Sequence, residues 1–242
     1  MPALRDHFAV RLGAQSELVS VNGLDAVLQG MADLKEQSVN CAVSRLSDEQ
    51  LAMRRVVAYV RGIFDGVKRV LADDGTAWLS VGDVVTGARG SRGSSLVSVP
   101  WRIALALQGD GWILRNAIVW STAGEMSRRT LALSNTYETM LLFAKQRRYS
   151  FDLDAVRLAA QEGQAQRRNP GDVWFSAGAA SPRPELPFDV ASRCITAGCP
   201  REGVVVDPFH DAASVEFAAV QSGRRFTRAN SERSDERQRW AA

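Results

Sequence analysis

Histidine and cysteine are scarce in this sequence, with two histidines and three cysteines among 242 residues. Because His7 and His210 are too few for a histidine-rich centre, we predict no metal site. The cysteines form no CxxC pair and are odd in number, which favours buried or free thiols in a reducing cytoplasm over a disulfide framework. They are Cys41, Cys194 and Cys199.

The sequence also lacks a long apolar run. Residues 1–7 have no apolar signal core, and no later stretch is long enough to cross a bilayer. We therefore expect a soluble, cytoplasmic protein with no membrane partner. The composition, 45% hydrophobic and 24% charged, is ordinary for a globular protein. A chain of this length can bury a substantial core, so residues 1–242 are expected to form a single domain.

A strong net charge is absent as well, since the formal charge is only +3. Net charge alone therefore does not indicate a nucleic-acid-binding protein. Arginines nevertheless occur in pairs. Each pair taken alone is as typical of a solvated surface as of a phosphate-binding one. Several pairs around one groove would instead form an electrostatic footprint for phosphate groups. The pairs are Arg128-Arg129, Arg147-Arg148, Arg167-Arg168 and Arg224-Arg225.

The sequence does contain a clear strand, turn and helix near its C-terminal end. A β-branched run over 204–206 leads into Asp207-Pro208-Phe209, and apolar residues at helical spacing follow through Val220. The turn is expected at the carboxyl edge of a sheet. In open α/β sheets that edge is where cofactors bind.

Earlier residues predict further elements of an α/β fold. We expect a buried strand over 38–43, a long amphipathic helix over 48–71 and a strand over 76–83. Gly75 is expected to follow the helix as a left-handed cap. The inner face of the helix is predicted to consist of Leu51, Val56, Val60, Phe64, Val67 and Leu71.

Several motifs together resemble those of the DNA N4-cytosine/N6-adenine methyltransferases. They are the Asp-Pro-Phe turn, KRVLADDGTAWLSVGD (68–83), VPWRIALALQGDGWILRNAIVW (99–120) and SNTYETMLLFAKQRRYSFDLDAVR (134–157). The expected catalytic turn, which follows the strand over 38–43, comes before the Asp-Pro-Phe cofactor turn in the sequence. That order is the circularly permuted arrangement of the family's β group. The resemblance implies a Rossmann-like α/β fold, with a mostly parallel seven-stranded sheet and helices on both faces. Within these motifs Trp101, Trp112 and Trp120 are expected to be core aromatics.

The catalytic turn departs from the family pattern, which is Asp/Ser/Asn-Pro-Pro-Tyr/Phe. In the family the turn accepts hydrogen bonds from the target amine while positive charge develops on nitrogen, and its aromatic stacks on an extruded base. Here the prolines and the aromatic are missing, and Arg45 places a cation beside the expected acceptor. We therefore interpret the turn as degenerate. It consists of Ser44, Arg45, Leu46, Ser47 and Asp48.

The cofactor turn is degenerate too. Asp211 and Ala213 stand where the family has glycines, which let the backbone approach S-adenosylmethionine. Asn230 replaces the acid that would hold the ribose hydroxyls. We expect no cofactor, or S-adenosylmethionine if the protein is active. His210 and Asp211 either form a new site or fill the former cofactor pocket with their side chains, and filling is the simpler expectation. The cofactor-site residues that the resemblance implies are Asp207, Pro208, Phe209, Asp211, Ala213 and Asn230.

Basic residues in and near loops predict contacts with DNA phosphates. The Gly/Ser/Arg-rich segment 86–98 is either a flexible linker or a DNA-contacting loop. Segment 158–183 corresponds to the family's recognition region and is short, which predicts weak sequence preference. Residues 230–242 are expected to be a charged tail. The predicted DNA-binding residues are Arg89, Arg92, Arg128, Arg129, Arg147 and Arg148.

Together these features predict a DNA-binding protein on a methyltransferase fold that is catalytically inactive. One alternative is an active S-adenosylmethionine-dependent N4-cytosine/N6-adenine DNA methyltransferase. Another is a non-catalytic partner subunit of an active methyltransferase. The expected partners are DNA and a second methyltransferase chain, in a homodimer or a heterodimer.

Overall fold

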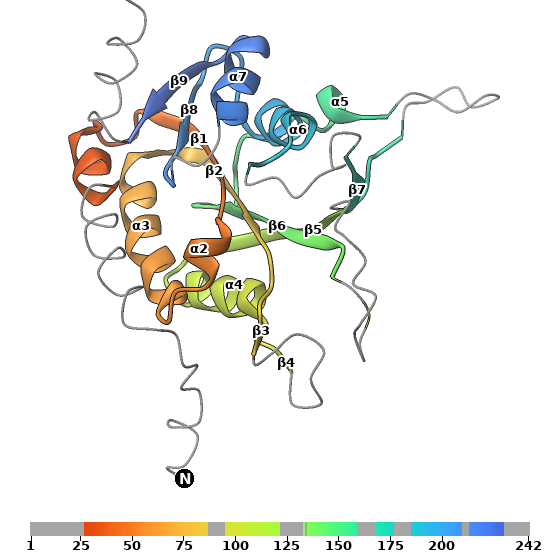
Figure 1. Ribbon diagram of the computed structural model, residues 1–242. Helices are drawn as coiled ribbons and strands as arrows, with labels where there is room; N and C mark the ends of the chain where they lie inside the picture. Colours follow the sequence, from red (N-terminus) through yellow and green to blue (C-terminus); the bar gives the residue numbers. More distant parts are fainter. Residues whose placement is uncertain are drawn as a thin grey trace, which may run out of the picture.

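A seven-stranded sheet forms the centre of the computed structural model, with the strand order β7-β5-β6-β2-β1-β8-β9 (Figure 1). The structure describes residues 27–86, 95–121, 133, 135–158, 168–176, 185–209 and 213–229. The strands of the sheet are β1 (Val39–Arg45), β2 (Leu71–Val81), β5 (Ile113–Ser121), β6 (Tyr137–Ala144), β7 (Val173–Phe175), β8 (Val204–Asp207) and β9 (Arg225–Arg228).

The strands of this sheet run in one direction except for β6. Pairing is parallel between β1 and both β2 and β8, between β8 and β9, and between β5 and β7. Strand β6 is antiparallel to both β2 and β5. The C-terminal ends of the parallel strands therefore meet at one side of the sheet, called here the carboxyl edge. In Figure 1, β2, β8 and β9 run downward toward it.

Helices cover both faces of the sheet (Figure 1). Two of them, α3 and α4, pack on one face, and α6 and α7 pack on the other. This arrangement confirms the predicted α/β, mostly parallel fold. Among the described residues, no helix is both long and apolar enough to cross a membrane. The bounds are α2 (Asp48–Leu51), α3 (Val56–Val70), α4 (Val99–Gly109), α5 (Leu153–Val156), α6 (Phe188–Gly198), α7 (Ala213–Gln221), and the hairpin β3 (Val85–Thr86) and β4 (Ser95–Leu96).

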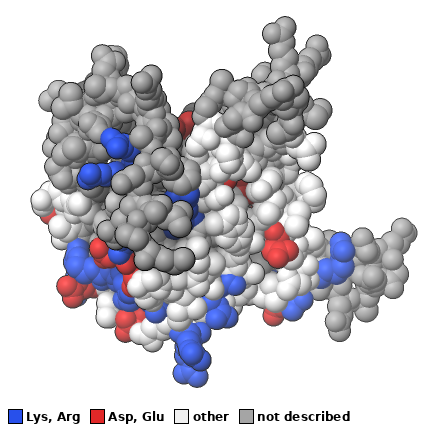
Figure 2. Space-filling model, turned by 90° about the horizontal axis from the view of Figure 1, so that it is seen from below, with Lys and Arg blue, Asp and Glu red and all other residues white. Residues whose placement is uncertain are grey.

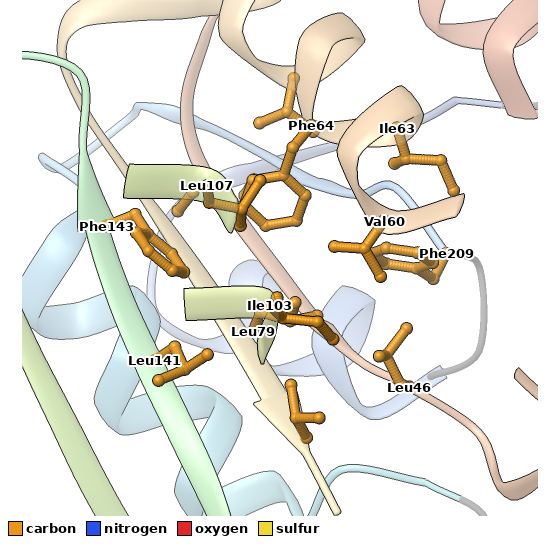
Figure 3. Close-up of a cluster of buried hydrophobic side chains, with 14 of the residues drawn as sticks. Leu46, Val60, Ile63, Phe64, Leu79, Ile103, Leu107, Leu141, Phe143 and Phe209 are labelled. Atoms are coloured by element: carbon orange, nitrogen blue, oxygen red, sulfur yellow. The ribbon is translucent and has the colours of Figure 1, made fainter. Parts of the chain in front are cut away.

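Alternate side chains of β1 enter the two cores, as the two-residue period of a strand requires. Ala42 belongs to the core under α3 and α4, whereas Cys41 and Val43 belong to the core under α6 and α7. Figure 3 shows the first of these cores, in which Leu46 and Phe209 lie near Val60 of α3. Both ends of the predicted site are thus anchored in the same apolar core.

The prediction of a single helix over 48–71 is wrong in one respect, because the structure has two helices there. A capping box at Ser47 begins α2, and α3 begins at Val56. Leu51 and Val56 are both buried. Five residues of continuous helix would place them about 140° apart around the axis, so the break allows both to face the core. The predicted inner-face residues are all buried, as expected.

Gly75 is not the left-handed cap that the sequence suggested. Helix α3 ends at Val70, and Leu71 is already extended. The glycines with positive φ among the described residues are Gly111, Gly171 and Gly223. Gly75 instead lies in β2, where a Cβ would come 2.6 Å from Cγ of Leu71. A close approach, rather than a left-handed turn, requires glycine here.

The predicted burial of Trp101 is wrong. Trp101 is 52% exposed, because the buried residues of α4 are Val99, Pro100, Ile103, Ala104 and Leu107. Trp112 and Trp120 are buried, as predicted. The predicted recognition segment 158–183 contains β7, an edge strand of the main sheet. The predicted loop 86–98 contains β4 at residues 95–96.

Candidate functional site

Two strand ends that are distant in sequence meet at the carboxyl edge. Strands β1 and β8 are parallel neighbours, paired through Cys41↔Val205 and Ala42↔Val206. The Ser44 hydroxyl donates a hydrogen bond to Oδ1 of Asp207. The backbone N–H of Phe209 donates to the same carboxylate oxygen over 3.1 Å and to Ser44 Oγ over 3.4 Å. The structure therefore joins the predicted catalytic turn to the predicted cofactor turn.

The turn after Ser44 is held without prolines. The N–H of Leu46 donates to the carbonyl of Ser80 over 2.9 Å, which ties it to the neighbouring strand β2. The Leu46 side chain is fully buried among the residues of Figure 3. On the other side of the site, the Phe209 ring lies 5.9 Å from the ring of Tyr59. Apolar packing thus supplies part of the constraint that prolines would give.

Arg45 faces a buried carboxylate. Its Nη2 lies 2.6 Å from Oε1 of Glu138, and its Nε lies 3.0 Å from each oxygen of that carboxylate. Both residues are less than a tenth exposed, at 6% and 7%. A bidentate pair of this kind is charge-assisted and geometrically specific. The cation expected beside Ser44 is therefore neutralised within the fold.

The carboxylate of Glu138 extends this contact into a network across four strands. Ser80 of β2 donates to Oε2 of Glu138 over 2.8 Å, and the indole N–H of Trp120 donates to Ser80 Oγ over 2.8 Å. Sequence reasoning missed Glu138 as part of the site. The available signal was its place in the family-like segment 134–157, where it is an acidic residue at the start of an otherwise apolar run.

The remaining residues of the predicted catalytic turn have structural roles. Ser47 accepts the N–H of Gln50 at 3.2 Å and donates its own N–H to Oε1 of Gln50 at 2.8 Å, which completes the capping box. The Asp48 side chain is 95% exposed and lies 3.9 Å from Nη2 of Arg45. Ser44, the first of the five predicted residues, hydrogen-bonds the carboxylate at the end of β8.

The predicted cofactor site is described in part. Pro208 is buried beside Asp207, and Ala213 is exposed at the first residue of α7. Arg228 lies level with Asp207 on β9 and forms an ion pair with Glu216 of α7. Asp207 ends β8 at the carboxyl edge, the edge at which open α/β sheets bind cofactors. His210, Asp211 and Asn230 lie outside the described residues.

Of the six predicted DNA-binding arginines, Arg147 and Arg148 lie within the described residues. Arg147 and Arg148 are exposed just after Ala144, the last residue of β6, which runs antiparallel to β2 and β5. They therefore lie at the edge opposite Ser44. Figure 2 shows blue side chains interspersed with red ones on the face seen from below, without a continuous basic stripe among the described residues. Arg89, Arg92, Arg128 and Arg129 lie outside the described residues.

The three cysteines are buried and free, as the sequence predicted. Burial raises the pKa of the Cys41 thiol well above its usual range, and the nearby Cys199 adds to the effect. Burial likewise raises the pKa of Cys194 and brings the pKa of Cys199 to about 11. Among the described residues, no group of histidine, cysteine and acidic side chains is arranged to hold a metal ion.

Comparison with known proteins identifies the family to which this chain belongs. A family model described as DNA methylase matches residues 42–234. The chain is 32% identical over 199 residues to the type II methyltransferase M.XycI of Xanthomonas campestris pv. cyanopsidis. The match covers 72% of this chain and 65% of that relative, so the chain spans slightly less than two thirds of its length. The chain belongs to the DNA methylase family, as its N4-cytosine/N6-adenine methyltransferase motifs predicted.

Solved structures share the fold. The cytosine-N4-specific PvuII DNA methyltransferase superposes with a TM-score of 0.67 at 14% identity, covering 83% of this chain and 78% of that one. A DNA modification methylase assigned in Thermus thermophilus, complexed with S-adenosyl-L-methionine, gives a TM-score of 0.65 at 19% identity. That match covers 89% of this chain and 92% of the other. Both confirm the methyltransferase-type sheet.

Proposed function

We propose that the protein is an active S-adenosylmethionine-dependent methyltransferase that modifies an exocyclic amino group of cytosine or adenine in DNA. The observation that carries the proposal is the hydrogen bond between Ser44 and Asp207 at adjacent strand ends. Family membership and the relative M.XycI support the same activity. They support it at least as well as the inactive protein that the degenerate motifs suggested.

Ser44 is suited to accept a hydrogen bond from the target amine. A serine hydroxyl has one proton and two lone pairs. Its proton is directed to Asp207 and one lone pair faces the Phe209 N–H, so the second lone pair is available for an amine N–H. The carboxylate also places negative charge near a nitrogen that becomes positive during methyl transfer. Ser44 itself is buried, at 1% exposure.

The pairing of Arg45 removes the main objection to activity. An unpaired guanidinium beside Ser44 would oppose the positive charge that develops on nitrogen. The bidentate contact with Glu138 turns that charge away and balances it. The charged group that contacts the Ser44 hydroxyl is consequently the carboxylate of Asp207.

The residues that would bind the cofactor are those at the end of β8 and the start of α7. Bound S-adenosylmethionine would supply the electrophilic methyl group. Asp207 and the buried Phe209 turn fit such a ligand, because they form the strand–turn–helix edge at which α/β sheets bind cofactors. The bound ligand in the Thermus thermophilus methylase supports this assignment by similarity of fold.

Calorimetric titration with S-adenosylmethionine and S-adenosylhomocysteine tests the cofactor half of the proposal. We expect saturable binding in the micromolar range, which Asp207→Ala abolishes. No heat of binding at millimolar ligand would refute it.

A second candidate is the non-catalytic DNA-binding protein. The specific observation in its favour is the loss of two prolines after Ser44 and of the glycines at positions 211 and 213. It predicts salt-dependent DNA binding with no methyl transfer. An assay for transfer distinguishes the two candidates directly.

A further inference from the structure

Two exposed aromatic side chains flank a small polar residue at the carboxyl edge. Ser121 of β5 pairs with Tyr137 of β6 on one side and with Phe175 of β7 on the other. Tyr137 is 48% exposed and Phe175 is 77% exposed. Residues directly opposite one another in a sheet project from the same face, so both rings rise on either side of Ser121.

The exposure of these rings is not a consequence of poor pairing in the sheet. The adjacent row of the same strands consists of Trp120, Glu138 and Trp174, and all three are buried. Trp174 donates its indole N–H to the carbonyl of Gly171 over 3.0 Å. The guanidinium of Arg193 lies 4.8 Å from the centre of the Trp174 ring. Strands β5, β6 and β7 are therefore regularly paired at this edge. Tyr137 and Phe175 are nevertheless not covered by apolar side chains of the described core.

The spacing of the two rings suits one planar group. Two strand spacings separate β6 from β7, which places the Cα atoms of Tyr137 and Phe175 about 10 Å apart. A planar base stacked between two rings needs about 3.4 Å on each side, a separation that two side chains leaning inward can reach. A helix has a diameter of about 10 Å with its side chains and would not fit between them.

The row lies at the same edge as the proposed methyl-accepting residue but not beside it, because β6 and β2 lie between β5 and β1. Tyr137 precedes Glu138 in the chain, and Glu138 binds the guanidinium of Arg45. Arg45 in turn follows Ser44 at the end of β1. Ser121, Tyr137 and Phe175 are therefore at the same edge as Ser44, and the turn after Ser44 contains no aromatic of its own.

We infer that Tyr137 and Phe175 form a stacking site for an unpaired nucleobase of DNA, with Ser121 as its floor. The two rings hold the base by stacking, which is tolerant of base identity because every base has a π face. The inference rests on DNA being the substrate, but not on methyl transfer. It assigns a base-stacking role to a part of the carboxyl edge that β6 and β2 separate from Ser44.

Binding of a single-stranded oligonucleotide that carries one 2-aminopurine tests the inference, because stacking quenches that fluorophore. We expect Tyr137→Ala and Phe175→Ala each to weaken binding by roughly 5- to 150-fold and to reduce the quenching. Tyr137→Phe keeps the ring and should bind as the wild type does. The matched control is Phe217→Ala on α7, a 56% exposed aromatic away from this row, which should leave binding unchanged.

The other outcomes separate this inference from the proposed function. If the wild type binds the oligonucleotide and both alanine variants bind equally well, the stacking site is refuted while DNA remains the substrate. If Tyr137→Phe loses as much affinity as Tyr137→Ala, stacking is not the interaction and the inference is again refuted. If the wild type binds no DNA at low salt, the DNA substrate fails and the inference fails with it. Unchanged melting temperatures of the variants establish that losses arise at the site.

Discussion

At the scale of single residues, the buried pair of Arg45 and Glu138 explains how a cation is tolerated next to a proposed methyl-transfer site. The two side chains satisfy each other through a bidentate contact, and Ser80 and Trp120 complete the network. A buried pair need not be more stable than apolar residues of the same size, but breaking it leaves an uncompensated charge. The position of Glu138 is therefore under strong physical constraint.

Glu138→Gln should lower the free energy of unfolding by roughly 3 kcal/mol, because it removes the negative partner of a buried guanidinium. Urea denaturation measures the change. The double variant Arg45→Met/Glu138→Gln should recover most of the loss, since it removes both charges. Arg157→Gln, in the exposed pair with Asp154, is the control and should change stability by less than about 1 kcal/mol. A single variant as stable as the wild type would contradict the assigned ion pair.

The buried thiols predict a loss of stability at alkaline pH. The folded chain keeps Cys41 and Cys194 protonated because burial raises the pKa of each, whereas the unfolded chain ionises them near the ordinary value of 9.0. The stabilisation is thus present below pH 9.0 and is lost as pH rises beyond it. Urea midpoints measured from pH 7 to pH 10, with Cys194→Ala as the comparison, test this. A midpoint that rises over that interval would contradict it.

At the scale of elements, α6 is placed by a glycine at its end. A Cβ on Gly198 would collide with Thr76 Oγ1 and come 2.5 Å from the indole nitrogen of Trp78. The same Thr76 hydroxyl donates to the Gly198 carbonyl over 2.9 Å. The absence of a side chain at Gly198 therefore sets how closely α6 approaches β2.

Gly198→Ala should destabilise the protein by about 1–3 kcal/mol, because the added methyl group overpacks a buried contact. Gly62→Ala in α3 is the matched control, since a Cβ there meets nothing within 4 Å. That change should stabilise the protein by about 0.5–1 kcal/mol through helix propensity. Thermal melting of both variants checks the pair. Equal and small effects would show that α6 does not pack as described.

Sequence patterns predicted the elements well where local periodicity decides them. The strand before Ser44, the Asp207 strand and the helix after it were expected from β-branched runs and helical spacing. The break between α2 and α3 was not expected. Apolar spacing along the sequence cannot show that Leu51 and Val56 reach the same core from two helices with different axes. Trp101 was misassigned for a related reason, since the buried side of α4 is defined by its neighbours in space.

The candidate site could be predicted only as far as its motifs reach. Asp207 and Ser44 were found because each follows a recognisable strand. Their hydrogen bond, and the contact of Arg45 with Glu138, depend on strand order in the sheet, which the sequence does not state. For the same reason Arg147 and Arg148 were grouped with residues of the site, although they lie at the opposite edge.

At the scale of the whole molecule, DNA that reaches Ser44 has to contact the carboxyl edge. Arg147 and Arg148 lie at the other edge. We therefore expect the double variant Arg147→Gln/Arg148→Gln to leave both DNA affinity and its salt dependence unchanged. The wild type should bind DNA steeply less well as salt increases, because binding phosphates releases counterions. A reduced salt slope in the double variant would instead place DNA on the opposite edge.

The most direct test of the central claim is transfer of a labelled methyl group from S-adenosylmethionine to unmethylated genomic DNA, which contains many short recognition sequences. We expect the wild type to label cytosine or adenine at an amino group. Ser44→Ala should lose at least about 100-fold in rate, since it removes the acceptor at the reacting nitrogen. Bound cofactor and bound DNA without any transfer would contradict the account and identify the protein as a non-catalytic member of its family.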